Sequence, residues 1–353
     1  MIHRRDFFDP RPLLQPVADI LAAVEEVRGL VNDADTASQA SLLRFGRRAM
    51  ATLFEVLLPF GTTSAHEAAQ AALDEIDRLE AQLTVYREDS EVSALNREAA
   101  TRPVSVKENL FDLLERSCRL HEETEGAFDI AVGALIKTWG FFRRQGRVPS
   151  DQERTEVMER IGMRHVILDP EKHVVSFARP GVEINLGSIG KGYALDCVAA
   201  KLRQEWNIAC GLIHGGQSSV IALGSEPGSS RGWSVGILDP RFPSRRLAVL
   251  RLKDRALGTS AATFQHFEHE GRRLGHILDP RSGWPAEGML SATVLAPSAA
   301  EADALATAFY VLGPDKARSY CGNHPEIAAL LLPHVPNTQP VALNLGKEDV
   351  QLL

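Results

Sequence analysis

The sequence contains few cysteines, and none of them is in a metal-binding arrangement. Cys118, Cys197, Cys210 and Cys321 are the only ones among 353 residues, and no C-x-x-C pair occurs. This spacing excludes the common Cys/His zinc patterns and a dense disulfide framework. We therefore expect four reduced cysteines that pack in the core.

Long hydrophobic runs and an excess of basic residues are also missing. No apolar stretch approaches the ~18 residues that a membrane-spanning helix requires, so we predict no integral membrane segment. The chain has 39 Lys and Arg against 46 Asp and Glu, a net charge of −7. A general nucleic-acid binder needs a basic face to neutralise phosphates, and we expect no nucleic-acid partner. An anionic ligand would need a local positive site made by a metal, a lysine or a helix N-terminus.

The first 44 residues are predicted to form a helical extension, and residues 45–353 a single domain. Arg4 and Arg5 resemble the start of an export signal, but acidic residues interrupt the apolar segment that a signal requires. We therefore expect a cytoplasmic location. Apolar residues at helical spacing predict an amphipathic helix from Leu13 to Val31.

From residue 45 onward, predicted strands follow one another mostly as hairpins, with helices inserted between blocks of strands. This pattern predicts an α+β fold with a largely antiparallel sheet. Helices are expected over residues 65–83, 109–125 and 188–206 and from about residue 298. Strands are expected over residues 52–58, 166–168, 173–177, 211–213, 219–223, 233–238, 247–252, 257–260, 274–278, 291–295 and 327–332.

One predicted helix near the C-terminus presents two oxygen-bearing side chains on the same face. Ser298 followed by Glu301 is a capping-box pattern, so this helix should begin at residues 297–299. Asp303 and Thr307 are four residues apart and therefore share a face. A carboxylate and a hydroxyl at one point suit a hard cation such as Mg²⁺. A surface Asp and a Thr bonded to its own backbone carbonyl is the simpler alternative, which the pair alone does not exclude.

A glycine-rich turn precedes the predicted helix over residues 188–206. Gly187, Gly190 and Gly192 would let the backbone approach a ligand, and the helix start offers free N–H groups to an anion. Lys191 adds a positive charge to this turn. The order of the glycines matches neither a P-loop nor a dinucleotide-binding fingerprint. A tight turn with a solvated lysine is the structural alternative.

His276 lies just before a strong turn sequence, Asp279 to Gly283. The turn places His276 near the end of the predicted strand over residues 274–278. A histidine there could act as a general base for a hydroxyl nucleophile. A half-buried histidine bonded to the backbone is the competing interpretation.

Three further groups are predicted to be structural or solvated instead of functional. They are His266, Glu268 and His269 at an exposed hairpin tip, Arg143, Arg144 and Arg147 in a solvated loop, and Trp139 and Phe141 as packing residues.

These segments, in this order, resemble the ApbE-type FAD:protein FMN transferases, a family of flavin transferases. The resemblance extends from about Met50 to Leu332. The matching motifs are Met50 to Val56, Leu83 to Asn96, Gly126 to Asp129 with Trp139 and Gly140, Glu183 to Asp196, His276 to Pro280, and Ser291 to Gly313.

The resemblance implies an ApbE-like α+β domain that binds FAD with Mg²⁺, transfers FMN to a Thr or Ser hydroxyl of an acceptor flavoprotein and releases AMP. By matching position, Asp303, Thr307 and the backbone carbonyl of Ser188 would hold the metal. The residues implied to line the flavin and pyrophosphate site are Met50, Tyr86, Ala127, Phe128, Asp129, Asn185, Lys191 and Leu278.

The same resemblance implies how the reaction is catalysed. His276 would activate the acceptor hydroxyl, while Lys191 and the metal at Asp303 would neutralise charge on the phosphoryl oxygens. Because Asp303 is expected on a ligand face outside the core, its replacement by alanine should leave the fold intact.

Several positions depart from the family pattern. Asn185 and Gln217 stand where the family has Asp, and Ala51 and Ala261 stand where it has Gly. Two other functions are therefore considered. One is an FAD pyrophosphatase that uses water and forms FMN and AMP, and the other is an FAD-binding protein with impaired catalysis.

Overall fold

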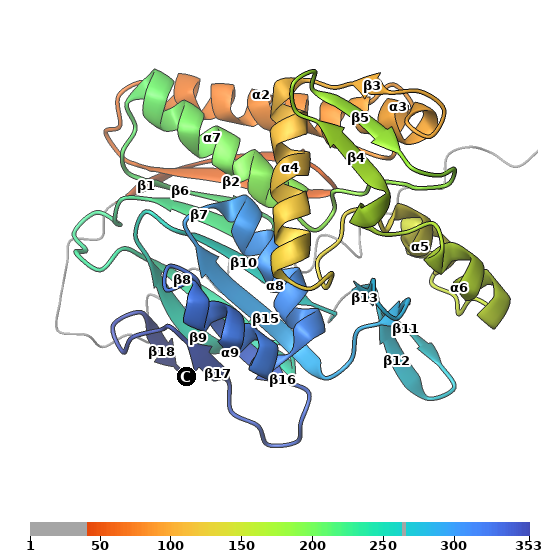
Figure 1. Cartoon of the computed structure of the whole chain (residues 1–353). Helices are drawn as coiled ribbons and strands as arrows, with labels where there is room; N and C mark the ends of the chain where they lie inside the picture. Colours follow the sequence, from red (N-terminus) through yellow and green to blue (C-terminus); the bar gives the residue numbers. More distant parts are fainter. Residues whose placement is uncertain (1–40, 263–265) are drawn as a thin grey trace, which may run out of the picture. The chain divides into compact units, whose positions relative to one another are not determined.

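The computed structural model describes residues 41–262 and 266–353 (Figure 1). The chain divides into the units Met1–Gln39 and Ala40–Leu353. The predicted helix from Leu13 to Val31 lies outside the described residues. The first strand begins at Leu42, so residues 42–44, which we predicted to belong to the extension, form part of the domain.

An eight-stranded sheet forms the centre of the domain, in the order β1-β2-β6-β7-β10-β15-β16-β17. Every neighbouring pair in it is antiparallel. Its strands are β1 Leu42–Ala49, β2 Thr52–Pro59, β6 Gly211–Gly215, β7 Ser219–Leu223, β10 Ala256–Ala261, β15 Met289–Ala296, β16 Ala328–Pro333 and β17 Val341–Leu343. The predicted α+β fold with a largely antiparallel sheet is confirmed.

Within the described residues, the other strands form four small sheets, and helices are inserted between the blocks of strands. The small sheets comprise β18 Val350–Leu352, β9 Phe242–Leu252 and β8 Trp233–Asp239; β3 Val104–Ser105, β5 Val174–Phe177 and β4 Val166–Asp169; β11 His266–His269 and β12 Arg272–Gly275; and β13 Leu278–Asp279 and β14 Trp284–Pro285. The helices are α2 Ala65–Leu83, α3 Glu91–Glu98, α4 Glu108–Glu123, α5 Gly133–Thr138, α6 Asp151–Met158, α7 Gly190–Trp206, α8 Ala299–Leu312 and α9 Pro314–Asn323, with 3₁₀ turns η2 Phe141–Arg143 and η3 Met163–His165. In the described part of the chain, no helix combines the length and apolar character needed to cross a membrane.

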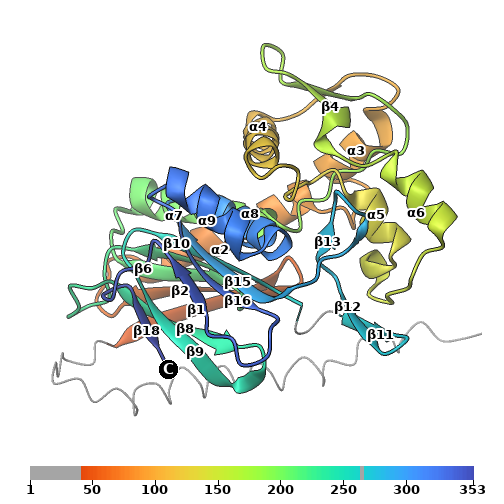
Figure 2. The same cartoon turned by 60° about the horizontal axis from the view of Figure 1, so that its bottom comes forward.

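The two faces of the large sheet are covered differently (Figure 2). Helices α2, α7 and α8 lie over one face, and the β8-β9-β18 sheet lies against the other. Alternation along β2 explains the helical side, because Phe54, Val56 and Leu58 all point to it and are fully buried. Alanines and Ile76 of α2 complete this core.

Helix α8 is buried on nearly all sides, and two glycines let its neighbours approach it closely. A Cβ atom built on Gly192 of α7 would lie 2.0 Å from the carbonyl oxygen of Ala299. A Cβ atom on Gly258 of β10 would lie 2.5 Å from the carbonyl group of Ala302. Only glycine allows the backbones to pack at these distances, so these two positions set the depth of α8 in the domain.

Most predicted elements are confirmed, but the predicted strand over residues 274–278 is wrong. Strand β12 ends at Gly275 and β13 begins at Leu278, which leaves His276 between them. The cause is a change of hydrogen-bonding partner. β12 pairs with β11, whereas the carbonyl of Ile277 accepts the N–H of Ala286 at 2.8 Å.

All four cysteines are free, as predicted, but their expected burial in the core is only partly correct. Cys321 is buried, whereas Cys118, Cys197 and Cys210 are partly exposed.

The tight turn between β1 and β2 carries backbone strain. Met50 and Ala51 have φ values of 48° and 60°, because a two-residue hairpin turn needs positive φ at its central positions. Alanine in this conformation costs about 1 kcal/mol relative to glycine. We expect Ala51→Gly to raise the free energy of unfolding by about 0.5–1 kcal/mol, measured by urea denaturation.

Ala49→Gly is the matched control for this prediction. Ala49 is the buried last residue of β1 and is not among the residues with positive φ. Glycine there should lower the free energy of unfolding, because it adds unfolded-state entropy without relieving strain. Equal effects of the two substitutions would contradict the strain assigned to Ala51.

Candidate functional site

Asp303 is buried between three elements of the domain. It lies on α8 with 6% of its surface exposed. The hydroxyl of Ser219 on β7 lies 2.8 and 2.9 Å from the two carboxylate oxygens and donates to them, and the N–H of Gly192 donates to Oδ2 at 2.8 Å. The expectation that Asp303 lies outside the core is therefore wrong. The carboxylate is part of the packing between α7, α8 and β7.

Burial makes the ionised form of Asp303 costly. Loss of solvent raises the pKa of Asp303 to about 6, and the positive charge of Lys191 acts in the opposite direction. A cation bound at the carboxylate would stabilise the ionised form further.

The donor set around Asp303 suits a hard cation. In the described part of the chain, no three His, Cys, Asp or Glu side chains gather as a metal cluster. Asp303 contributes a carboxylate, and Ser219 and Thr307 contribute hydroxyls, oxygen groups that fit Mg²⁺ better than zinc. Thr307 Oγ1 lies 3.1 Å from Ser260 Oγ and donates to the carbonyl of Asp303 at 3.3 Å. The second contact is the bond to the helix backbone that the simpler interpretation of Thr307 expected.

The glycine-rich turn reaches Asp303 through the first turn of α7. Helix α7 begins at Gly190, two residues later than predicted, and Gly192 contacts the carboxylate directly. Ser188 and Lys191 are half-buried in the same turn. The structure therefore brings together the turn and the helix that were implied to share a metal. The ligand roles of Ser188 and Thr307 stay predictions.

The β1–β2 turn and the β6–β7 turn lie at the same end of the sheet. The N–H of Gly216 donates to the carbonyl of Leu53 at 2.8 Å, which joins the β6–β7 turn to the strand that follows Met50. The N–H of Thr259 donates to the carbonyl of Ser218 at 2.7 Å. The β6–β7 turn, which contains Gln217, therefore lies beside the strand that follows Met50.

His276 lies beside a second, smaller core. Helices α5 and α6 pack there against the segment from β11 to β14. Trp139 donates its indole N–H to the carbonyl of Gly283 at 2.9 Å, and the rings of His276 and Phe141 are nearly perpendicular with a centroid distance of 6.5 Å. These contacts hold the turn after His276 on α5. They also confirm Trp139 and Phe141 as packing residues.

Tyr86 approaches the same 3₁₀ turn from another part of the chain. Its side chain is 69% exposed, and its ring stacks on Phe142 with a centroid distance of 4.7 Å. Phe142 is the neighbour of Phe141, which contacts His276. The turn η2 therefore connects Tyr86 and His276.

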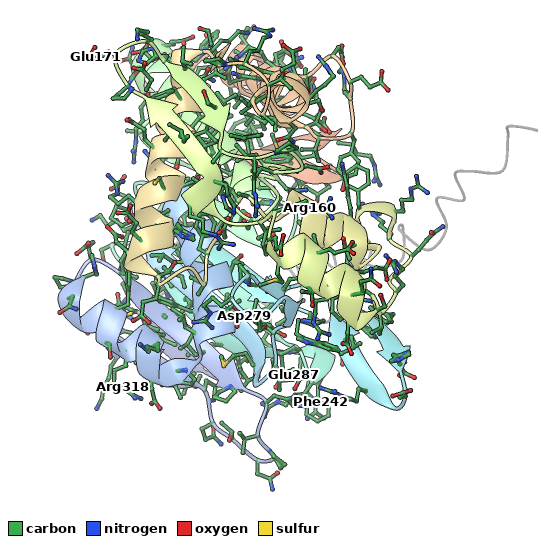
Figure 3. All side chains as sticks on the ribbon, turned by 45° about the vertical axis from the view of Figure 1, so that its right-hand side comes forward. Arg160, Glu171, Phe242, Asp279, Glu287 and Arg318 are labelled. Carbon is green, nitrogen blue, oxygen red and sulfur yellow. The ribbon has the colours of Figure 1, made fainter. Side chains whose placement is uncertain are left out.

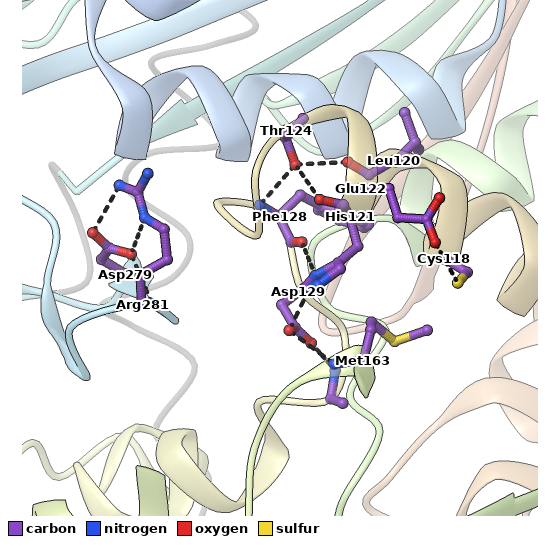
Figure 4. A network of polar contacts seen from close by, with 11 residues as sticks. Cys118, Leu120, His121, Glu122, Thr124, Phe128, Asp129, Met163, Asp279 and Arg281 are labelled. Atoms are coloured by element: carbon purple, nitrogen blue, oxygen red, sulfur yellow. Dashed lines mark hydrogen bonds and ion pairs between the residues drawn. The ribbon is translucent and has the colours of Figure 1, made fainter. Parts of the chain in front are cut away.

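Asp129 is engaged by the protein's own backbone (Figure 4). Its carboxylate accepts N–H groups from Ala131 at 2.7 Å and Met163 at 3.1 Å, and lies 3.2 Å from Nδ1 of His121. The bond to Asp129 raises the pKa of His121. Asp129 thus shapes the loop that follows α4. Its implied flavin contact stays a prediction.

The remaining implied flavin residues are also engaged within the domain. The side chains of Ala127 and Phe128 are buried in the main core, and Leu278 is buried in the His276 cluster. Asn185 accepts the N–H of Gly187 at 2.9 Å and so closes the glycine-rich turn. This bond needs only an acceptor oxygen, which Asn supplies as well as an Asp would.

A shallow hollow of about 400 Å³ lies beside the His276 segment. Asp279, Trp284, Glu287 and Val311 of α8 contribute to its lining, and Asp279 and Glu287 are labelled in Figure 3. Asp303 and Lys191 do not line it, so this hollow is not the candidate metal site. The exposed hairpin tip formed by β11 and β12 is as predicted.

Sequence reasoning missed Ser219. Its side chain is fully buried, and its hydroxyl is the one side-chain donor that the structure describes on Asp303. The available signal was weak, because Ser219 simply opens an otherwise apolar strand.

Comparison with known proteins gives consistent matches. The model of the ApbE family matches residues 50–331. The FAD:protein FMN transferase of Treponema pallidum is 33% identical over 281 residues, which is 76% of this chain and 77% of that protein. The protein of the same name from Escherichia coli K12 is 33% identical and covers 71% of this chain and 72% of its own length.

Solved structures agree with these matches. The ApbE protein of Thermotoga maritima superposes with a TM-score of 0.77 and 30% identity, covering 83% of this chain and 94% of that one. The flavin transferase ApbE of Vibrio cholerae gives a TM-score of 0.75 and 25% identity, with 86% and 97% covered. With its antiparallel sheet, its glycine-rich turn and the matched region, this chain belongs to the ApbE family.

Proposed function

We propose that this protein transfers the FMN part of FAD to a Thr or Ser hydroxyl of an acceptor protein and releases AMP, in a Mg²⁺-dependent reaction. Relatives at about 33% identity carry the name FAD:protein FMN transferase. The observation that carries the proposal is the buried carboxylate of Asp303 beside Lys191 and the glycine-rich turn. A buried carboxylate suits a cation, and a lysine suits phosphates beside it.

Asp303, Thr307 and the carbonyl of Ser188 would hold the metal. When bound, Mg²⁺ would act as a Lewis acid on the pyrophosphate oxygens. Lys191 supplies a second positive charge near the carboxylate. The N–H groups of Gly190, Gly192 and Tyr193 are bonded within the protein, so the positive charges of Lys191 and the metal would bind the phosphate oxygens. These groups orient the pyrophosphate and stabilise the charge that develops on it.

The nucleophile in this proposal is the acceptor hydroxyl. Its oxygen bonds to the phosphorus of the FMN phosphate, the bridging P–O bond breaks, and AMP leaves with that electron pair. A ring nitrogen of His276 takes the hydroxyl proton. The cluster around Trp139 and Phe141 restrains the His276 segment, which supports a positioned base.

The experiment is to incubate the protein with FAD, Mg²⁺ and a flavoprotein domain that carries a target Thr or Ser. We expect a fluorescent protein band that survives denaturation, together with one AMP released per FMN attached. Chelation of Mg²⁺ with EDTA should abolish the band. Intact FAD bound to the protein, with no band under any of these conditions, would contradict the proposal.

Chromatography of FAD, FMN and AMP separates this activity from two alternatives. A pyrophosphatase would form free FMN and AMP without an acceptor protein. A binding protein without activity would return intact FAD after Mg²⁺ is added. FMN transferase activity predicts AMP formation that depends on the acceptor.

A further inference from the structure

Asp196 on α7 accepts hydrogen bonds from the start of α8. Its Oδ1 accepts the N–H of Ala299 at 2.7 Å, and its Oδ2 accepts the N–H of Ala300 at 3.0 Å and the hydroxyl of Ser298 at 2.7 Å. Ser298 itself caps the helix by accepting the N–H of Glu301. A carboxylate from a neighbouring helix therefore satisfies two more of the free N–H groups in the first turn of α8.

The contact between α7 and α8 is reciprocal. Asp196 of α7 binds the first turn of α8, and Asp303 of α8 binds the N–H of Gly192 in the first turn of α7. Gly192 and Asp196 are one helical turn apart, and so are Ala299 and Asp303. Each helix thus presents a carboxylate to the N-terminal turn of the other.

Apolar packing alone would hold this pair of helices loosely. The first turns of α8 carry mainly alanine, and α7 meets them through Gly192, so few side chains interlock there. Small, smooth surfaces restrict sliding and rotation weakly, whereas charge-assisted hydrogen bonds have narrow distance and angle ranges. The bonds of Asp196 therefore add a directional restraint on how far α8 extends along α7.

A third helix supports the same carboxylate. Arg116 of α4 places Nη1 3.1 Å from Ser298 Oγ, as a donor, and 3.7 Å from Asp196 Oδ2. Asp196 keeps 21% of its side-chain surface exposed. The network joins α4, α7 and α8 and involves neither Lys191 nor His276.

We propose that Asp196 is a positioning residue of the metal site. It holds α8 at the position along α7 where Asp303 and Thr307 face the glycine-rich turn. The inference rests on the proposed function for its metal, but it concerns the binding of Mg²⁺ and not the transfer step. Asp196 contacts the first turn of α8 and is not among the residues proposed to hold the metal or the substrate.

The test uses Asp196→Asn, which keeps the volume of the side chain. One oxygen still accepts the N–H of Ala299, but the amide NH₂ then faces two donors, Ala300 N–H and Ser298 O–H. The measured quantity is the Mg²⁺ concentration that gives half of the maximal rise in unfolding temperature of the FAD-bound protein. We expect this concentration to rise about tenfold or more, as is typical when a residue that orients a metal ligand is replaced. The KM for FAD should change less than about twofold, and kcat should recover at high Mg²⁺.

Asp239→Asn is the matched control. Asp239 is a carboxylate with 9% of its side-chain surface exposed, against 21% for Asp196. It accepts the N–H of Arg241 at 2.8 Å and lies on β8 against the opposite face of the sheet. This variant should lower the unfolding temperature without changing the Mg²⁺ requirement. Ser298→Ala removes one of the three donors to Asp196 and should raise the Mg²⁺ requirement by a smaller factor. It replaces Asp196→Asn as the test if that variant does not fold.

An unchanged Mg²⁺ requirement in Asp196→Asn and Ser298→Ala would overturn the inference, as would an equal shift in Asp239→Asn. A wild-type protein whose stability with FAD does not respond to Mg²⁺ would overturn both the metal assignment and the role of Asp196. If Mg²⁺ stabilises the wild type and the shift appears, but no FMN is transferred, the positioning role stands and the proposed function fails.

Discussion

Replacing Asp303 with alanine is expected to lower the rate of FMN transfer by about 10³-fold or more. The proposed metal site has a single carboxylate, so its loss removes several kcal/mol of transition-state stabilisation. The rate is measured as AMP released from FAD in the presence of Mg²⁺ and an acceptor domain. The effect should appear in kcat and in the response to Mg²⁺ more than in the KM for FAD.

The same substitution should also weaken the fold, contrary to what the sequence alone suggests. Alanine leaves the hydroxyl of Ser219 and the N–H of Gly192 without their acceptor in a buried place. Each unsatisfied group costs about 1–3 kcal/mol. A loss of activity in Asp303→Ala would therefore combine a chemical and a structural effect.

Asp303→Asn separates the two effects. An amide retains an acceptor oxygen and the same volume, and it removes the cost of burying an ionised carboxylate, which is what raises the pKa of Asp303. Without Mg²⁺ this variant should unfold at the same temperature as the wild type or higher. Its stability should not respond to Mg²⁺, and its transfer rate should be as low as that of Asp303→Ala. Wild-type transfer by Asp303→Asn would rule out Asp303 as a metal ligand.

Replacing Gly192 with alanine is expected to destabilise the domain by about 3 kcal/mol or more. The new methyl carbon would lie 2.0 Å from the carbonyl oxygen of Ala299 and 2.7 Å from the nitrogen of Ala300, so α7 and α8 would have to separate. Separation also lengthens the bond from the Gly192 N–H to Asp303. The free energy of unfolding is measured by urea denaturation, and activity should fall together with Mg²⁺ affinity.

Gly190→Ala is the control from the same turn. A Cβ atom at Gly190 would meet only the Leu186 Cβ, at 3.7 Å, an ordinary contact. Since alanine favours helix over glycine, this variant should be as stable as the wild type or slightly more so. Similar destabilisation by both substitutions would mean that the turn needs glycine for its conformation and not for the approach of α8.

The local sequence pattern predicted most helices and strands correctly. The helix over residues 65–83 matches α2 at both ends, and Ser298 caps α8 as its pattern indicated. In both cases the signal lies within a few neighbouring residues, through apolar spacing or a cap. The prediction of a strand through His276 was wrong because β12 pairs with β11 and β13 pairs with β14. Strand pairing cannot be predicted from a few neighbouring residues.

The sequence by itself determined the family, the antiparallel α+β fold and the identity of the candidate groups, because motifs and periodicity are properties of the chain. Only the tertiary structure decided that Asp303 is buried and which groups hold it. Its partners Ser219 and Gly192 are 84 and 111 residues away, and Asp196 reaches the start of α8 across 103 residues. Such contacts depend on how closely α7, α8 and β7 pack, and that distance follows from steric fit at two glycines that no local pattern reveals.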